Sequence, residues 1–258
     1  MDLQSKWKAL KESRKKPIRS TTLPPACTTE GQPPGTILKF GPRVRQEEIE
    51  ALKAAREWGV PVPAVLDVRT SPKGHMEFSM ELVPGDCLET AWPGMSATEK
   101  EDVARQLGKI VSLLRAASRG EAPIGGIGGP ARDLRYYGEY TGGPFTTEAE
   151  FNNFQMDFYH TTPDAIQRAL CQSISSDHRI VFSHADLSPR NIIVKDGHIA
   201  ALVDWELSGW YPEYWEYVKL LECATSCKDW VNHADLIFDT QYPKELTAYQ
   251  AIARWQKS

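Results

Sequence analysis

The stretch VFSHADLSPRNIIV, residues 181–194, decides how the rest of the chain is interpreted. It places His184, Asp186 and Asn191 between two short apolar runs of the kind that form strands. Two interpretations compete. The stretch is either a catalytic loop held between two strands or an ordinary polar turn whose side chains only satisfy backbone groups. The sequence on either side distinguishes between them.

The stretch continues into a predicted β-hairpin. The run NIIV is followed by KDGH and then by IAALVD, and the Asp196–Gly197 pair favours a primed two-residue turn. Asn191 begins the first strand and Asp204 ends the second, so we expect these two residues to be neighbours in space. Asp186, which precedes the first strand, is expected to lie at the same point. The polar-turn interpretation is therefore disfavoured.

Two aspartates and an asparagine at one point form an oxygen-rich cluster. Carboxylate and amide oxygens suit Mg²⁺, which keeps its remaining positions for water and substrate phosphates. The other carboxylate is then available to accept a hydroxyl proton or to orient the hydroxyl. These are the parts that phosphoryl transfer needs, because that reaction depends mainly on positioning and on charge neutralisation.

The residues HADLSPRN, 184–191, resemble the catalytic loop of the aminoglycoside phosphotransferase/choline kinase branch of the protein-kinase-like fold. Asp204-Trp-Glu resembles that branch's counterpart of the kinase D-F-G segment, and it follows Asn191 by 13 residues, as in kinases. The likeness to fungal members of the phosphotransferase enzyme family covers roughly residues 36–222. It rests on the segments GTILKFG, EEIEALKAA, VPVPAVLD, MELVPGDCLETAW, GPFTTEAEF and WELSGWYPEYWEYVKLL.

This resemblance implies roles for the residues of the cluster. Asp186 would be the catalytic base or the group that positions the hydroxyl. Asn191 and Asp204 would hold Mg²⁺. His184 would brace the loop without reacting.

The resemblance also implies an ATP site in the N-terminal part of the chain. Lys39 would contact the nucleotide phosphates, oriented by Glu48 on the following helix. Residues 81–83, with Glu81 and Val83 at the ends, would form the hinge whose backbone reads adenine. The disfavoured alternative is that Lys39 and Glu48 form a surface ion pair, and such a pair contributes little.

The implied architecture is a two-lobed, protein-kinase-like α+β fold with a reduced N-terminal β lobe and a mainly helical C-terminal lobe. We expect a basic helix and an irregular segment over residues 1–35, and the small lobe over residues 36–83. Residues 84–258 would form the large lobe, with the catalytic loop and the metal site. Local signals agree, since Gly59 ends a predicted helix and Ser96-Ala-Thr-Glu99 forms a predicted capping box.

One departure from the family pattern keeps two functions open. No G-x-G-x-x-G loop precedes Lys39. Because Asp186, Asn191 and Asp204 are all present, we favour an ATP- and Mg²⁺-dependent kinase for a hydroxyl of an aminoglycoside-like or metabolite-like acceptor. The alternative is a kinase-fold protein with lost or weak nucleotide binding. The second class includes a pseudokinase-like binding protein and a protein with different chemistry in the same cleft. Binding of ATP–Mg²⁺ discriminates between them.

Two further segments invite functional interpretations that we disfavour. IGGIGGPARD, residues 124–133, lacks the strand before it and the Lys-Ser/Thr after it that a nucleotide loop needs, and it is interpreted as a plain turn. WELSGWYPEYWEY, residues 205–217, could line an acceptor pocket, but aromatic residues dominate protein cores, and we expect core packing.

The composition limits the remaining possibilities. A net charge of −4 argues against a dedicated nucleic-acid partner, although residues 1–19 are rich in lysine and arginine. No apolar run is long enough to span a bilayer, and the N-terminus lacks a signal-peptide core. The five cysteines are scattered. We therefore expect a cytoplasmic protein with reduced thiols, which binds a nucleotide and a small molecule; the oligomeric state stays open.

Overall fold

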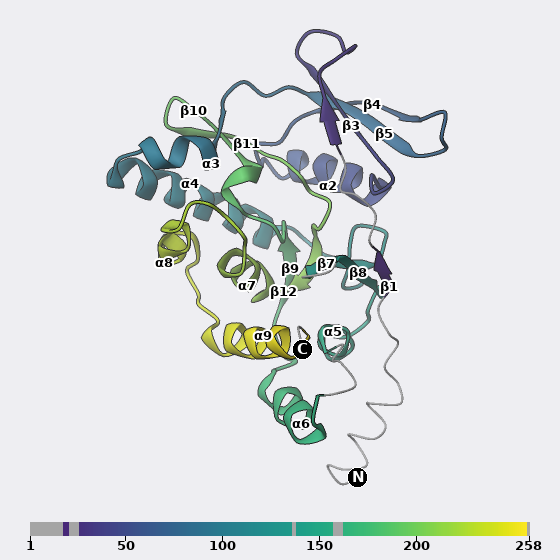
Figure 1. The fold of residues 1–258 in the computed structure, drawn as a ribbon, viewed down its shortest axis with the longest axis vertical. Helices are drawn as coiled ribbons and strands as arrows, with labels where there is room; N and C mark the ends of the chain where they lie inside the picture. The colour runs from purple at the N-terminus through teal and green to yellow at the C-terminus, as the bar shows by residue number, and fades with distance from the viewer. Residues whose placement is uncertain (1–17, 21–25, 136–137, 157–161, 257–258) are drawn as a thin grey trace.

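The chain has the expected two-lobed α+β architecture. The computed structural model describes residues 18–20, 26–135, 138–156 and 162–256 (Figure 1). A small antiparallel sheet lies at one end of the molecule, and the mainly helical lobe makes up the rest (Figure 1). The helix predicted near the N-terminus falls on residues outside this described part and stays a prediction.

The small lobe is one sheet with a helix packed beside it. Its strands are ordered β2-β3-β5-β4, and their bounds are β2 Ala26–Thr28, β3 Thr36–Phe40, β4 Val65–Thr70 and β5 Met76–Glu81. Helix α2, Gln46–Glu57, buries Ile49 and Leu52, and Gly59 follows it at φ +80°, a conformation that favours glycine. The predicted β lobe and the predicted helix end are thus confirmed.

The loop of residues 184–191, which the sequence predicts to be catalytic, lies between two strand pairs of the large lobe. Strand β9, Ile180–Ser183, precedes the loop and pairs with β12, Gly209–Pro212. After the loop come η2, Pro189–Asn191, and the hairpin of β10, Ile192–Lys195, and β11, His198–Leu202. Asp196 and Gly197 have φ of +50° and +78°, which confirms the predicted primed turn.

Short strands connect this hairpin and the N-terminal segment to other parts of the molecule. Strand β6, Asp86–Cys87, pairs with β10. It therefore joins the chain that leaves the small lobe to the β10–β11 hairpin. A second sheet has the order β1-β8-β7, with bounds β1 Ile18–Ser20, β7 Ala131–Arg135 and β8 Gly138–Gly142. Residues 18–20 therefore pair within the large lobe and not with the small-lobe sheet.

Helices form most of the large lobe. Helix α4, Ala97–Ala116, begins at Ser96 with the predicted capping box, in which Ser96 and Glu99 bond each other's backbone N–H. The remaining helical elements are α3 Leu88–Ala91, η1 Trp92–Gly94, α5 Glu148–Gln155, α6 Asp164–Ser173, α7 Trp215–Leu221, η3 Trp230–His233, α8 Ala234–Ile237 and α9 Pro243–Gln256.

The aromatic segment of residues 205–217 belongs to the core. Trp205, Tyr211 and Trp215 are each at most 1% exposed to solvent. Their rings pack against Phe151 and Phe182. The core-packing interpretation of this segment is therefore confirmed. Within the described part of the chain, no helix is long and apolar enough to cross a membrane.

Candidate active site

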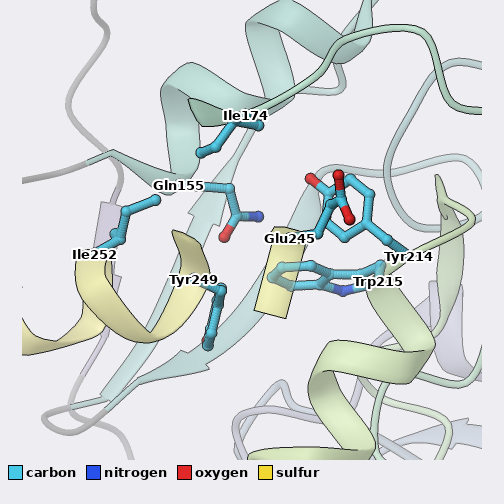
Figure 2. A pocket seen from close by; sticks show the side chains of 7 residues that line it. All are labelled: Gln155, Ile174, Tyr214, Trp215, Glu245, Tyr249 and Ile252. Carbon is cyan, nitrogen blue, oxygen red and sulfur yellow. The ribbon is translucent and has the colours of Figure 1, made fainter. Parts of the chain in front are cut away.

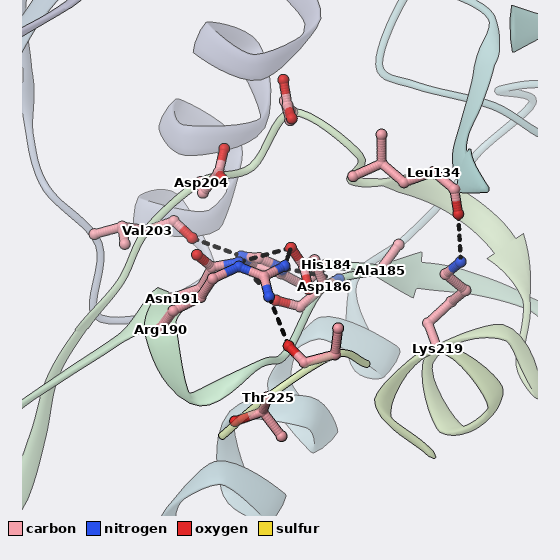
Figure 3. A network of polar contacts seen from close by, with 12 residues as sticks. Leu134, His184, Ala185, Asp186, Arg190, Asn191, Val203, Asp204, Lys219 and Thr225 are labelled. Atoms are coloured by element: carbon pink, nitrogen blue, oxygen red, sulfur yellow. Dashed lines mark hydrogen bonds and ion pairs between the residues drawn. The ribbon is translucent and has the colours of Figure 1, made fainter. Parts of the chain in front are cut away.

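Asp186 lies in the loop of residues 184–191, and one of its carboxylate oxygens accepts hydrogen bonds from neighbouring side chains (Figure 3). Its Oδ2 accepts hydrogen bonds from Asn191 Nδ2 at 2.9 Å and from Arg190 Nη2 at 2.6 Å. Among the described residues, none donates a hydrogen bond to Oδ1. The carboxylate is thus fixed through one oxygen, and the other remains available to a hydroxyl group. Arg190, which also donates to the Ala224 carbonyl at 3.0 Å, was missed by the sequence interpretation.

The backbone before Asp186 is held by a buried acid on α7. Glu216 accepts from the N–H of His184 at 2.5 Å and from the N–H of Ala185 at 2.9 Å. Ala185 has a φ of +65°, so these bonds hold a conformation that alanine adopts at a cost. Burial raises the pKa of Glu216 to about 7, although the two N–H donors favour the charged form. The only sequence signal for Glu216 is an acid inside an aromatic, buried helix.

His184 connects the loop to the strand opposite it. The ring is fully buried, its Nε2 donates to the Val203 carbonyl at 3.1 Å, and its Nδ1 accepts from the Asp186 N–H at 3.2 Å. Burial lowers the pKa of His184, which agrees with this neutral tautomer. The contacts are those of a bracing residue, as the resemblance implied.

Lys39 of the small lobe contacts Asp204, which follows the second strand of the β10–β11 hairpin. Its Nζ lies 2.5 Å from Glu48 Oε1 and 2.7 Å from Asp204 Oδ1. Lys39 and Glu48 are 4% and 2% exposed, so the surface ion-pair interpretation is wrong. Burial opposes the charge of Lys39, but the two carboxylates more than offset it and hold the pKa of Lys39 above its usual value. Burial also disfavours the charge of Asp204, yet Lys39 holds the pKa of that carboxyl below its usual range.

Asn191 and Asp204 lie at neighbouring ends of the hairpin, as predicted, and both line the same cleft. The Val203 N–H donates to the Asn191 carbonyl at 3.0 Å, which brings the two hairpin ends together. Because Asn191 Nδ2 donates to Asp186, the amide oxygen of Asn191 faces away from that bond. Lys39 occupies only one carboxylate oxygen of Asp204. The donor set, one amide and one carboxylate oxygen, fits Mg²⁺.

A cleft lies between the small-lobe sheet and the β10–β11 hairpin. It encloses about 310 Å³, a volume in the range of small-molecule sites. Its apolar lining includes Ile37, Met80, Leu82, Ile193 and Val203. Its polar lining includes Lys39, Asn191, Asp204 and Glu206. An apolar slot with a charged end suits a ligand with an aromatic part and an anionic part.

The predicted hinge residues line this cleft, but they differ in whether their backbone N–H groups are already hydrogen-bonded within the protein. Glu81, Leu82 and Val83 all contact the cleft. The N–H of Glu81 donates to Ala64 at 2.9 Å, and the N–H of Leu82 donates to Gly35 at 2.8 Å. No hydrogen bond to the Val83 backbone occurs within the described residues. Of the three positions, Val83 is the one with an amide available to a ligand.

Glu206 is a further acid at the charged end of the cleft. Its Oε1 lies 2.7 Å from Arg43 Nη2, and both side chains are largely buried. Burial raises the pKa of Glu206 to about 7, and the nearby Asp204 adds to the rise. The sequence interpretation noted this residue within Asp204-Trp-Glu but gave it no role, because the partner Arg43 lies in the other lobe.

The strand register shows which ends of β2 and β3 lie near the hinge and near Lys39. Thr36, at the start of β3, pairs with Glu81, so the turn of residues 29–35 lies beside the hinge. Ala26 pairs with Phe40, next to Lys39, so the chain enters β2 at the charged end of the cleft. The segment before β2, residues 21–25, reads TTLPP and contains no glycine. These five residues lie outside the described part of the chain.

A second cavity lies at the opposite end of the large lobe, among α5, α6, α7 and α9 (Figure 2). It has a volume of about 10 Å³, enough for about one water molecule. Gln155 and Glu245 reach into it beside the rings of Trp215 and Tyr249. The cavity is too small for an acceptor molecule.

Comparisons with known proteins identify the family. Residues 26–255 match the model of the phosphotransferase enzyme family. No curated protein matches the chain in sequence. A putative aminoglycoside phosphotransferase from Ralstonia eutropha JMP134 has a similar structure, with a TM-score of 0.60, 14% sequence identity, and coverage of 97% of this chain and 86% of that chain.

Two solved structures of a second enzyme are also similar. The apo form of a thermostable mutant of aminoglycoside phosphotransferase APH(4)-Ia is 16% identical at a TM-score of 0.58, over 96% of this chain and 88% of that chain. A ternary complex of a variant of that enzyme with ADP and hygromycin B is 15% identical at a TM-score of 0.58, over 90% and 84% of the two chains. These likenesses show the protein-kinase-like fold. With a family match that covers most of its length, the chain belongs to the phosphotransferase enzyme family.

Proposed function

We propose that this chain transfers the terminal phosphoryl group of ATP to a hydroxyl of a small molecule, in a reaction that depends on Mg²⁺. One observation carries the proposal. Lys39, held by Glu48, bonds Asp204, and both residues line the cleft together with Asn191, which donates a hydrogen bond to Asp186. A cation for phosphates, oxygen ligands for a metal and a carboxylate for the hydroxyl thus lie together.

The nucleotide would lie in the cleft with its base at the apolar end. The Val83 N–H would bind adenine, and Glu81 would shape the hinge through its bonds to Ala64. Lys39 would neutralise charge on the phosphates. The lobes would meet near residues 83–84, with small-lobe residues 36–83 above the nucleotide and residues 84–258 below it. A solved relative that binds ADP in this fold supports the nucleotide assignment.

The acceptor hydroxyl would approach the free oxygen of Asp186. Asn191 and Arg190 hold the other oxygen, so the carboxylate is already oriented before the acceptor arrives. Asn191 and Asp204 would hold Mg²⁺, which neutralises phosphate charge when bound. The acceptor would be an aminoglycoside-like or metabolite-like alcohol. Use of ATP and five free cysteines agree with a cytoplasmic location.

An acceptor screen tests this function. The protein is incubated with ATP and Mg²⁺ and with aminoglycosides, amino alcohols or polyols, and phosphorylated products are detected by mass spectrometry. We expect a product with at least one acceptor class, and none when Mg²⁺ is removed by a chelator. Tight ATP binding without any product, and without ATP hydrolysis, would instead favour a pseudokinase-like binding protein.

A further inference from the structure

The glycine-rich stretch that resembled a plain turn forms a contact between the lobes. We call residues 124–132 the clamp loop. Gly125 exchanges backbone hydrogen bonds of 3.0 and 2.8 Å with Trp210 of β12. Ile124 exchanges bonds of 2.8 and 2.9 Å with Phe145. A Cβ on Gly209 would lie 2.3 Å from the Gly125 carbonyl oxygen, so both backbones approach closely. The clamp loop is thus fixed to the large lobe.

The other side of the clamp loop receives the side chain of Glu47 from α2. Arg132 Nη2 lies 2.8 Å from Glu47 Oε1, and the two side chains are 9% and 20% exposed. A Cβ on Gly129 would lie 2.2 Å from Glu47 Oε1 and 2.6 Å from Glu47 Cγ. A Cβ on Gly126 would lie 3.6 Å from Glu47 Cβ. The glycines therefore leave the space that Glu47 fills, and Arg132 supplies the charge that it meets.

Glu47 adjoins the acid that holds Lys39. Residues 47 and 48 are consecutive on α2, so one faces the clamp loop while the next reaches Lys39 at 2.5 Å. Arg43, just before the helix, adds a second tether to the large lobe through Glu206 at 2.7 Å. A displacement of α2 would break the Glu47–Arg132 contact and the buried Lys39–Glu48 pair together, and breaking a buried pair is costly.

We infer that the clamp loop positions α2 for phosphoryl transfer, with Glu47 and Arg132 as positioning residues. The large lobe thereby keeps Glu48 against Lys39 without a partner protein or a modification. This inference rests on the proposed function for its kinetic consequence. The helix placement itself is measurable without turnover.

The test uses glycine-to-alanine variants in the full chain. Gly129 lies outside the left-handed region, so an alanine there is limited by the contact with Glu47 and not by the backbone. We expect Gly129→Ala and Arg132→Met each to lower kcat/KM for ATP by about tenfold. Amide hydrogen exchange in residues 46–57 should become faster. Gly94→Ala is the matched control, because no atom lies within 4 Å of the added carbon, and it should match the wild type in both measurements.

A double variant separates positioning from folding. Glu47→Ala removes the side chain that an alanine at position 129 would strike, so Gly129→Ala should add no further loss in the Glu47→Ala background. A further loss there, or wild-type exchange of α2 in Glu47→Ala, would overturn the inference. If the wild type shows no turnover, the proposed function fails, and the exchange of residues 46–57 still decides whether the clamp loop holds α2.

Discussion

Replacing Asp186 with asparagine is expected to lower kcat by about two to four orders of magnitude while ATP affinity stays unchanged. A positioned general base contributes this much in many enzymes. The amide keeps the shape of the side chain but cannot take up the hydroxyl proton. Asp186 is not among the residues that line the nucleotide cleft, so binding should not change. The measurement is steady-state transfer to an acceptor, beside ATP titration of the same samples.

Asp196→Asn is the matched control for this substitution. Asp196 lies in the tight turn of the same hairpin at φ +50°, a conformation that asparagine tolerates well. Its side chain is exposed, and we expect wild-type activity. An Asp186→Asn enzyme that kept more than about a tenth of wild-type turnover would fall short of the effect of a general base and contradict the role given to Asp186.

Replacing Lys219 with methionine is expected to reduce the free energy of unfolding by about 3–5 kcal/mol, the usual effect of removing one partner of a buried ion pair. Lys219 on α7 lies 2.7 Å from Asp133 Oδ1 and 3.2 Å from the Tyr249 hydroxyl, and the Asp133 side chain is fully buried. Burial opposes the charge of Lys219, but Asp133 more than offsets it and raises the pKa of Lys219. Denaturant unfolding measures the change.

Two further variants show whether the loss of stability comes from the buried ion pair. Lys53→Met removes a half-exposed lysine that pairs with Glu50 at 3.1 Å, and its effect should stay below about 1 kcal/mol. The double variant Asp133→Leu/Lys219→Met removes both charges and should recover part of the lost stability. A Lys219→Met protein as stable as Lys53→Met would contradict a structural role for the pair.

The parts of the site that follow from local sequence were predictable. The Asp196–Gly197 turn and the strand lengths set the hairpin, and the hairpin alone brings Asn191 to Asp204. The burial of Lys39 with Glu48 needed the family resemblance, because nine residues of separation do not distinguish a buried pair from a surface pair.

The residues that were missed depend on contacts between distant segments. Glu216 holds the backbone of residues more than 30 positions earlier, and no spacing rule connects them. Arg43 meets Glu206 from 163 positions away. The glycines of the clamp loop were interpreted as a turn because their neighbour, Glu47, lies in the other lobe. A run of glycines indicates that another group packs closely against the backbone, but it does not identify that group.

Binding of ATP by calorimetry, with and without Mg²⁺, tests whether the cleft holds a nucleotide together with a metal ion at Asp204. The wild type is compared with Asp204→Asn and with Asp67→Asn, an exposed aspartate on β4 that serves as the control. We expect the wild type and the control to bind ATP more tightly with Mg²⁺, and Asp204→Asn to lose this gain. A wild type that does not bind ATP, or an Asp204→Asn protein with an unchanged response to Mg²⁺, would contradict this expectation.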